Sequence, residues 1–127
     1  MKTWLITGCS SGLGKGLAEA VLAHGDQAVV TARRPETLRH FTDCYPGTAL
    51  ALPLDVNDDA QADAAVEAAL ARFGRVDVLA SVAGYCLRGA VEECSMDEIH
   101  RQFETNFFGT VRMIRKVLPS MRAVRNG

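Results

Sequence analysis

The sequence lacks the features that would direct a protein to nucleic acid or into a membrane. Its 14 lysines and arginines face 15 acidic residues, and the formal net charge of −1 leaves no basic excess for a nucleic acid. No apolar run approaches the length of a membrane span. A short apolar run at the start is interrupted by Gly8, so we expect no signal peptide. The composition, 48% hydrophobic and 23% charged over 127 residues, is typical of one globular domain.

The sequence also lacks a cysteine pair of the kind that binds a metal or undergoes redox chemistry. Its four cysteines stand far apart and include no Cys-x-x-Cys motif. This spacing is typical of reduced thiols that pack as small apolar residues. We therefore expect no metal site and a cytoplasmic location.

Apolar runs alternate with helical patterns along the whole chain. Strands are expected at 4–6, 27–31, 49–54 and 76–82, and helices at 13–24, 35–44, 57–73 and 96–121. Asn57 is a candidate N-cap, Ser95 and Glu98 form a candidate capping box, and Pro119 is expected to bend or end the last helix. Strands that alternate with helices predict a parallel sheet with right-handed crossovers. We expect an α/β, Rossmann-type doubly wound sheet in the order 3-2-1-4, with a single domain over residues 1–127.

A glycine-rich segment joins the first expected strand to the first expected helix. Its residues are Thr7, Gly8, Cys9, Ser10, Ser11, Gly12, Leu13 and Gly14. The start of a helix exposes free N–H groups and the positive end of a dipole, and glycines allow a pyrophosphate to approach them. The hydroxyls of Ser10 and Ser11 add donors. The segment predicts a pyrophosphate site, with a tight turn that binds no ligand as the alternative.

Two arginines follow the second expected strand, at the usual offset from the glycine-rich segment. Ala32 stands where an acidic residue would bind the adenosine ribose of NAD. The forked guanidinium groups of Arg33 and Arg34 match a 2′-phosphate instead. The alternatives are that both arginines are solvated, or that Glu36 is the ribose acid. We expect NADP(H) to be favoured over NAD(H).

The spacing Thr-Gly-x-x-x-Gly-x-Gly at residues 7–14 resembles that of the classical short-chain dehydrogenase/reductase family. Residues 6–14 are similar to the hydroxysteroid and retinol dehydrogenase branch, and the likeness extends over essentially the whole chain. The resemblance implies an oxidoreductase that interconverts an alcohol and a carbonyl by hydride transfer. A small carbonyl or alcohol would be the substrate of the complete enzyme, and the loop 85–89 hints at a lipid-like or bulky one.

The resemblance also implies further cofactor contacts beyond the glycine-rich segment. Asp55 would contact the adenine amino group, helped by the backbone of Val56. Ala83 and Gly84 correspond to the last two residues of the family's Asn-Asn-Ala-Gly motif and would line the cofactor. Ser81 and Val82 replace the two asparagines of that motif.

Asn106 corresponds to a family asparagine that helps to hold a water on the proton path to the catalytic lysine. Asparagine is a poor residue for the interior of a helix, so we expect a buried polar role. Bonding to a neighbouring carbonyl without a catalytic purpose is the alternative. The family's Tyr-x-x-x-Lys is missing, because Tyr45 and Tyr85 are the only tyrosines and neither has a lysine four residues later. The catalytic serine is missing as well.

Three interpretations remain open. In the first, the chain is the amino-terminal portion of an NADP(H)-dependent oxidoreductase, truncated before the later strands and inactive alone. In the second, it is a short protein that binds NADP(H) without turnover, as a sensor or interaction module. In the third, which the arginine pair disfavours, it is a doubly wound domain that binds another nucleotide. We also expect a homo-oligomer formed through the long helix around 96–121.

Overall fold

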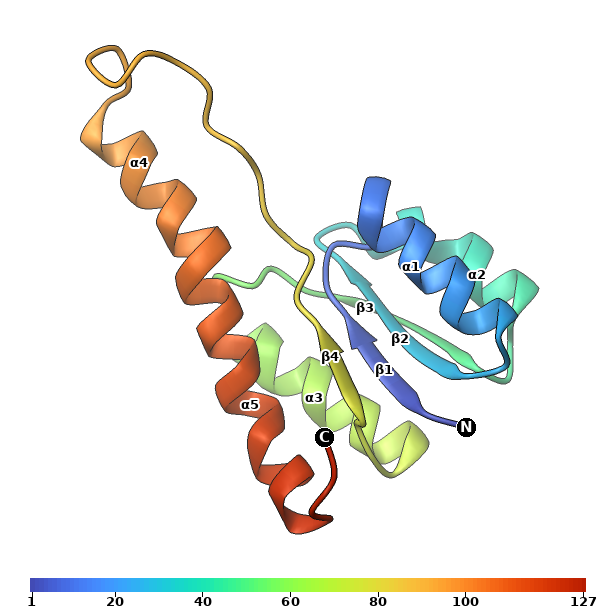
Figure 1. The fold of residues 1–127 in the computed structure, drawn as a ribbon. Coiled ribbons are helices and arrows are strands. Elements are labelled where there is room, and N and C mark those ends of the chain that lie inside the picture. Colours follow the sequence, from blue (N-terminus) through green and yellow to red (C-terminus); the bar gives the residue numbers. More distant parts are fainter.

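The computed structural model describes residues 1–127 as a four-stranded parallel sheet with helices on both faces (Figure 1). The strands are β1 (Thr3–Ile6), β2 (Gln27–Ala32), β3 (Ala49–Pro53) and β4 (Val78–Ala80). Their order is β3-β2-β1-β4, which confirms the predicted order. In the register, Leu5 of β1 pairs with Val29 of β2 and with Leu79 of β4. The carboxyl ends of all four strands therefore meet at one edge of the sheet.

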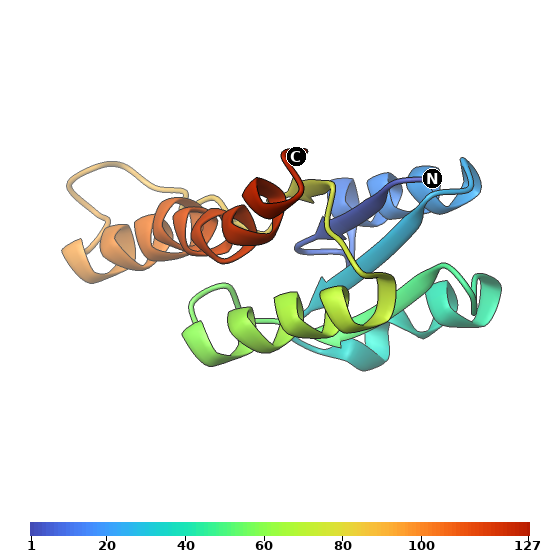
Figure 2. The ribbon, with the colours of Figure 1, turned by 90° about the horizontal axis from the view of Figure 1, so that it is seen from below.

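The helices follow the strands in the alternation that the sequence predicted. They are α1 (Gly12–Ala23), α2 (Arg39–Cys44), α3 (Asp59–Phe73), α4 (Met96–Phe103) and α5 (Gly109–Ala123). A 3-10 turn, η1 (Pro35–Leu38), precedes α2, and a π-helical segment, η2 (Glu104–Phe108), joins α4 to α5. Figure 2 shows α4, η2 and α5 as one long rod that extends beyond the sheet. None of the helices combines the length and apolarity needed to cross a membrane.

The core has two layers, one on each face of the sheet. Leu5 and Val29 pack with α3 and α5, whereas their neighbours Ile6 and Val30 pack with α1 and α2. All four side chains are completely buried. Side chains alternate between faces along a strand, so a strand covered on both faces must be apolar at successive positions. This explains why the central strands are continuous apolar runs in the sequence.

The last expected strand and the long helix differ from the prediction. Only Val78–Ala80 form β4, instead of the expected 76–82. The expected single helix at 96–121 is interrupted by η2, and Pro119 lies inside α5 without ending it. Pro119 is exposed and lies near the end of α5, which continues to Ala123.

The expected helix caps were partly correct. Ser95 and Glu98 form both halves of the capping box at the start of α4. The N-cap of α3 is Asp58 and not Asn57, because the Asp58 carboxylate accepts a hydrogen bond of 3.0 Å from Gln61 N. Asn57 uses its side chain in another contact, which belongs to the candidate site.

At the amino ends of the strands, a buried carboxylate holds several segments together. Asp77 Oδ2 accepts a hydrogen bond of 2.8 Å from Thr3 N, at the start of β1. Asp77 Oδ1 accepts from Arg75 Nε at 2.7 Å and from Asn126 Nδ2 at 3.1 Å. The beginning of β1, the segment before β4 and the segment after α5 are thus joined at Asp77. Figure 1 shows the N-terminus at the beginning of β1 and the C-terminus near the beginning of β4.

Candidate functional site

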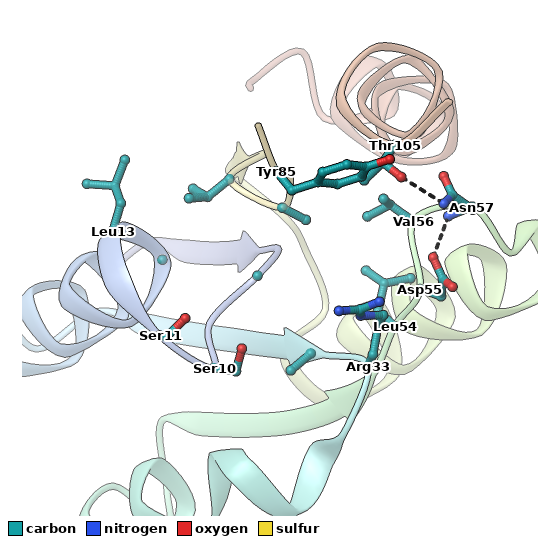
Figure 3. A pocket seen from close by; sticks show the side chains of 16 residues that line it. Ser10, Ser11, Leu13, Arg33, Leu54, Asp55, Val56, Asn57, Tyr85 and Thr105 are labelled. Carbon is teal, nitrogen blue, oxygen red and sulfur yellow. Dashed lines mark hydrogen bonds between the residues drawn. The ribbon is translucent and has the colours of Figure 1, made fainter. Parts of the chain in front are cut away.

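A cleft of about 660 Å³ lies at the carboxyl ends of the strands. It is bounded by the loop between β1 and α1, by the ends of β2 and β3, and by the segment after β4. In a doubly wound sheet, ligands bind at this place, where the direction of the strand order reverses. Figure 3 shows Ser10 and Ser11 on one side of the cleft and Arg33 and Asp55 on the other.

Most of the predicted cofactor residues line this one cleft. They are Gly8, Ser10, Ser11, Leu13, Gly14, Arg33, Asp55, Val56, Ala83 and Gly84. Four predicted site residues, Thr7, Gly12, Arg34 and Asn106, are not part of the lining. Sequence reasoning missed Leu54, Asn57 and Thr105, which also line the cleft.

The glycine-rich loop depends on glycine for its backbone conformation and for its close contacts. Gly8 and Gly12 have φ angles of +75° and +57°, which other residues rarely adopt. A Cβ on Gly8 would lie 2.9 Å from Ala83 Cα, and one on Gly14 would overlap the Gly8 carbonyl oxygen. The loop therefore lies directly against the segment after β4.

The start of α1 has free hydrogen-bond donors. Ser11 is the N-cap residue of this helix, but its side chain makes no capping hydrogen bond. Ser10 and Ser11 are exposed, and the first turn of α1 contains no acidic residue. The unpaired N–H groups, the two hydroxyls and the positive end of the helix dipole can therefore bind an anionic group.

Thr7 and Cys9 support the loop from inside the protein. The buried Thr7 hydroxyl oxygen accepts hydrogen bonds of 3.0 Å from both Val82 N and Ala83 N. The Cys9 thiol donates to the Ile6 carbonyl at 3.2 Å, and burial raises the pKa of this thiol to about 11. A thiol with such a high pKa remains protonated at neutral pH and is a poor nucleophile.

The end of β2 brings one of the two predicted arginines to the cleft. Arg33 is exposed and lines the cleft, beside Leu54 and Asp55 in Figure 3. Arg34 is also exposed but lies outside the lining. Neither arginine forms an ion pair within the protein, so the Arg33 guanidinium is free for a ligand. Glu36, the alternative ribose acid, lies in η1 and not in the lining.

The loop after β3 is fixed by hydrogen bonds at several points. Asp55 N donates to Gln61 Oε1 at 2.8 Å, and Asp55 Oδ1 accepts from Asn57 N at 2.9 Å. Asn57 Nδ2 donates to Thr105 Oγ1 at 2.9 Å, which connects the loop with η2 across the rim of the cleft (Figure 3). Since Asn57 and Thr105 are 48 residues apart, no local pattern indicates this contact.

Asn106, in the π-helical segment η2, binds the segment after β4 through two hydrogen bonds. Its Oδ1 accepts from Tyr85 N at 3.0 Å, and its Nδ2 donates to Tyr85 O at 2.7 Å. The Asn106 carbonyl accepts a hydrogen bond of 3.0 Å from Thr110 Oγ1. The expected buried role was wrong: Asn106 is exposed, and its neighbour Phe107 is 55% exposed, because η2 extends beyond β4, the last strand of the sheet.

The comparisons with known proteins agree with this geometry. The family model described as short chain dehydrogenase matches residues 2–127. Oxidoreductase BOA17 of Botryotinia fuckeliana is 41% identical over 99% of this chain and 46% of its own length. Human retinol dehydrogenase 8 is 41% identical over 99% of this chain and 42% of its own length. The chain thus spans less than half the length of these relatives.

Solved structures show the same fold. The crystal structure of a short-chain dehydrogenase from Streptomyces avermitilis has a TM-score of 0.94 and 45% identity, over 99% of this chain and 46% of that one. A 3-ketoacyl-(acyl-carrier-protein) reductase from Brucella melitensis, complexed with NADH, has a TM-score of 0.89 and 32% identity, over 96% of this chain and 51% of that one. An alcohol dehydrogenase from Thermococcus sibiricus, complexed with 5-hydroxy-NADP, has a TM-score of 0.90 and 28% identity, over 99% and 55%.

Proposed function

The chain belongs to the short-chain dehydrogenase family, and we propose that it binds NADP(H) in the cleft, as part of an oxidoreductase that interconverts an alcohol and a carbonyl. The main support for NADP(H) comes from the residues at the end of β2. Arg33 lies in the cleft lining without an ion-pair partner, and Ala32 takes the place of a ribose-binding acid. A guanidinium pairs well with a phosphate, whereas an acid there would repel it.

The rest of the cleft fits a dinucleotide. The N–H groups at the start of α1 would bind the pyrophosphate, and Gly8 and Gly14 allow the close packing that forms the loop around them. Asp55 and Val56 would contact the adenine base, and Ala83 and Gly84 would line the remainder of the cofactor. When bound, the nicotinamide would supply the chemistry, exchange of a hydride with a substrate carbon.

The 127 residues supply cofactor binding but no paired group for proton transfer. Tyr85 is 46% exposed at the cleft, and Gly89 stands where the family pattern would place a lysine. Lys116 is held on α5 by Asp63 at 2.8 Å and Asp59 at 3.0 Å, and hydrogen bonds to these carboxylates raise the pKa of its amine. The charge of Lys116 is thus paired with two carboxylates of α3, and Lys116 does not line the cleft to which Tyr85 contributes. The same observation supports the second candidate, an NADP(H)-binding sensor or interaction module without turnover.

Self-association through the long rod is part of the proposal. Phe103, Phe107 and Phe108 are each more than half exposed, and Ile114 is 40% exposed. Exposed large apolar side chains that cluster on one element mark a candidate protein contact. This supports a homo-oligomer formed through α4, η2 and α5.

The cofactor assignment is tested by titrating the purified chain with NADPH and NADH. We expect Arg33→Ala to weaken NADPH binding by about 10- to 100-fold, the value of a charge-assisted hydrogen bond, with little effect on NADH. Arg34→Ala is the matched control, since it removes the same charge outside the cleft lining. Equal losses for both cofactors in the Arg33 variant would refute the assignment.

A further inference from the structure

Arg112 on α5 holds the loop that forms one wall of the cleft. Its Nη1 atom donates a hydrogen bond of 2.6 Å to the backbone carbonyl of Val56. Val56 is buried and lines the cleft, whereas Arg112 is outside the lining. A guanidinium that donates to a carbonyl forms a charge-assisted hydrogen bond, which is stronger than a neutral one. Arg112 therefore acts on the cleft through the backbone of another segment.

Two carboxylates from other elements hold the Arg112 guanidinium in place. Its Nη2 lies 3.1 Å from Glu104 Oε1, at the start of η2, and its Nε lies 3.6 Å from Asp59 Oδ1, at the start of α3. The Arg112 side chain is only 21% exposed, so solvent screens these contacts less than those of an open surface pair. One side chain thus joins three elements around the loop after β3.

α5 also packs closely against the loop after β3, which forms this wall of the cleft. Gly109, the first residue of α5, is buried, and a Cβ there would lie 2.7 Å from Val56 Cγ2. The Val56 carbonyl is thus bonded from α5, while no acceptor within the protein takes the Val56 N–H. The Asp55 carboxylate is also bonded on one side only: its Oδ1 accepts a hydrogen bond from Asn57 N, and its Oδ2 accepts none within the protein. The Val56 N–H and Asp55 Oδ2 therefore remain free, on a loop that is hydrogen-bonded to α5 and α3.

We infer that Arg112 is a positioning residue for adenine recognition: it fixes the Val56–Asn57 peptide, whose N–H holds the Asp55 carboxylate next to the free Val56 N–H. The inference rests on the proposed function, in which this loop contacts the adenine of the cofactor. Adenine carries an amino group that donates and ring nitrogens that accept, so it complements one free acceptor and one free donor. Without Arg112 the peptide can rotate, and the pair loses its fixed spacing.

The test compares NADPH with nicotinamide hypoxanthine dinucleotide phosphate, in which a carbonyl replaces the adenine amino group and N1 carries a hydrogen. The unchanged 127-residue chain is expected to bind the adenine form about tenfold more tightly, the value of one hydrogen bond to a charged group. Arg112→Gln should weaken the adenine form by about tenfold and leave the hypoxanthine form unchanged, so that the preference disappears. Arg115→Gln, an exposed arginine on the same helix without an ion pair, should change neither.

A purely structural role for Arg112 would lower both affinities equally, and that result would overturn the inference, as would an unchanged adenine preference. If Arg112→Gln does not fold, as judged by thermal melting, Arg112→Lys replaces it. Lysine keeps a charge between Glu104 and Asp59 but lacks the fork that bonds carbonyl and carboxylate together, so it should also lose the preference. Full preference in the lysine variant would overturn the inference. Failure of the unchanged chain to bind NADPH would refute the proposed function, and this inference with it.

Discussion

Replacing Thr7 by valine removes the hydroxyl that holds the segment after β4 against the glycine-rich loop. The hydroxyl oxygen accepts 3.0 Å hydrogen bonds from the amides of Val82 and Ala83, and the Thr7 side chain is buried. Valine preserves the shape but leaves both amides without an acceptor. An unsatisfied buried donor costs about 1–3 kcal/mol, and both amides are only partly buried. Because each amide should cost an amount near the lower end of this range, we expect the two together to lower the free energy of unfolding by about 2–3 kcal/mol.

Urea denaturation followed by circular dichroism measures this loss. Thr7→Ser is the matched control, because serine keeps the hydroxyl and removes one methyl group, at a cost of about 1 kcal/mol. NADPH affinity should fall with stability in the valine variant, since Ala83 and Gly84 line the cleft. If the valine variant is as stable as the serine variant, the hydroxyl does not hold this segment and the reasoning is wrong.

Three further predictions concern the thiol, the chemistry and the surface. Burial raises the Cys9 pKa from 9.0 to about 11, so the protonated thiol adds stability that is fully present below about pH 9 and is lost as the pH rises toward 11. The difference in urea midpoint between the unchanged chain and Cys9→Ala should therefore be smaller at pH 10.5 than at pH 8. An equal difference at both pH values would contradict the raised pKa. The chain should show no appreciable NADPH oxidation with ketones or quinones, because general acid–base help is worth about 10²–10⁴-fold; rapid oxidation would contradict this. Light scattering should show concentration-dependent association, reduced by Phe103→Ser with Phe107→Ser, whereas a monodisperse monomer with a cooperative melt would exclude an adhesive surface.

The parts of the fold that depend on neighbouring residues could be predicted from the sequence. The glycine-rich loop was recognisable because its strand, its glycines and its helix are adjacent in the chain. The strand order followed from right-handed crossovers between strands separated by helices. The short β4 was not predictable, because the amides of Val82 and Ala83 bond to the distant Thr7 side chain and not to a neighbouring strand.

The parts of the site that depend on distant residues could not be predicted. Arg112 and Val56 are 56 residues apart, and Asn57 and Thr105 are 48 apart, so neither pair leaves a local pattern. The π-helical turn was also invisible, because one additional residue in a turn shifts the apolar periodicity without interrupting it. The buried role expected for Asn106 relied on its apolar neighbours in the helix, but those neighbours are exposed beyond the last strand.

The rod formed by α4, η2 and α5 connects the two walls of the cleft. From η2, Asn106 bonds both polar atoms of the Tyr85 backbone, beside the wall after β4. From α5, Arg112 bonds the Val56 carbonyl, in the wall after β3. Gly109 lies between these two residues in the sequence, and its missing side chain allows α5 to approach Val56. Because one helical element bonds to both walls, a displacement of α5 would act on the wall after β3 and on the wall after β4 together. The packing of α5 against the sheet therefore acts on both walls, in addition to the contacts that hold each wall separately, such as the hydrogen bonds of the Thr7 hydroxyl and of Gln61.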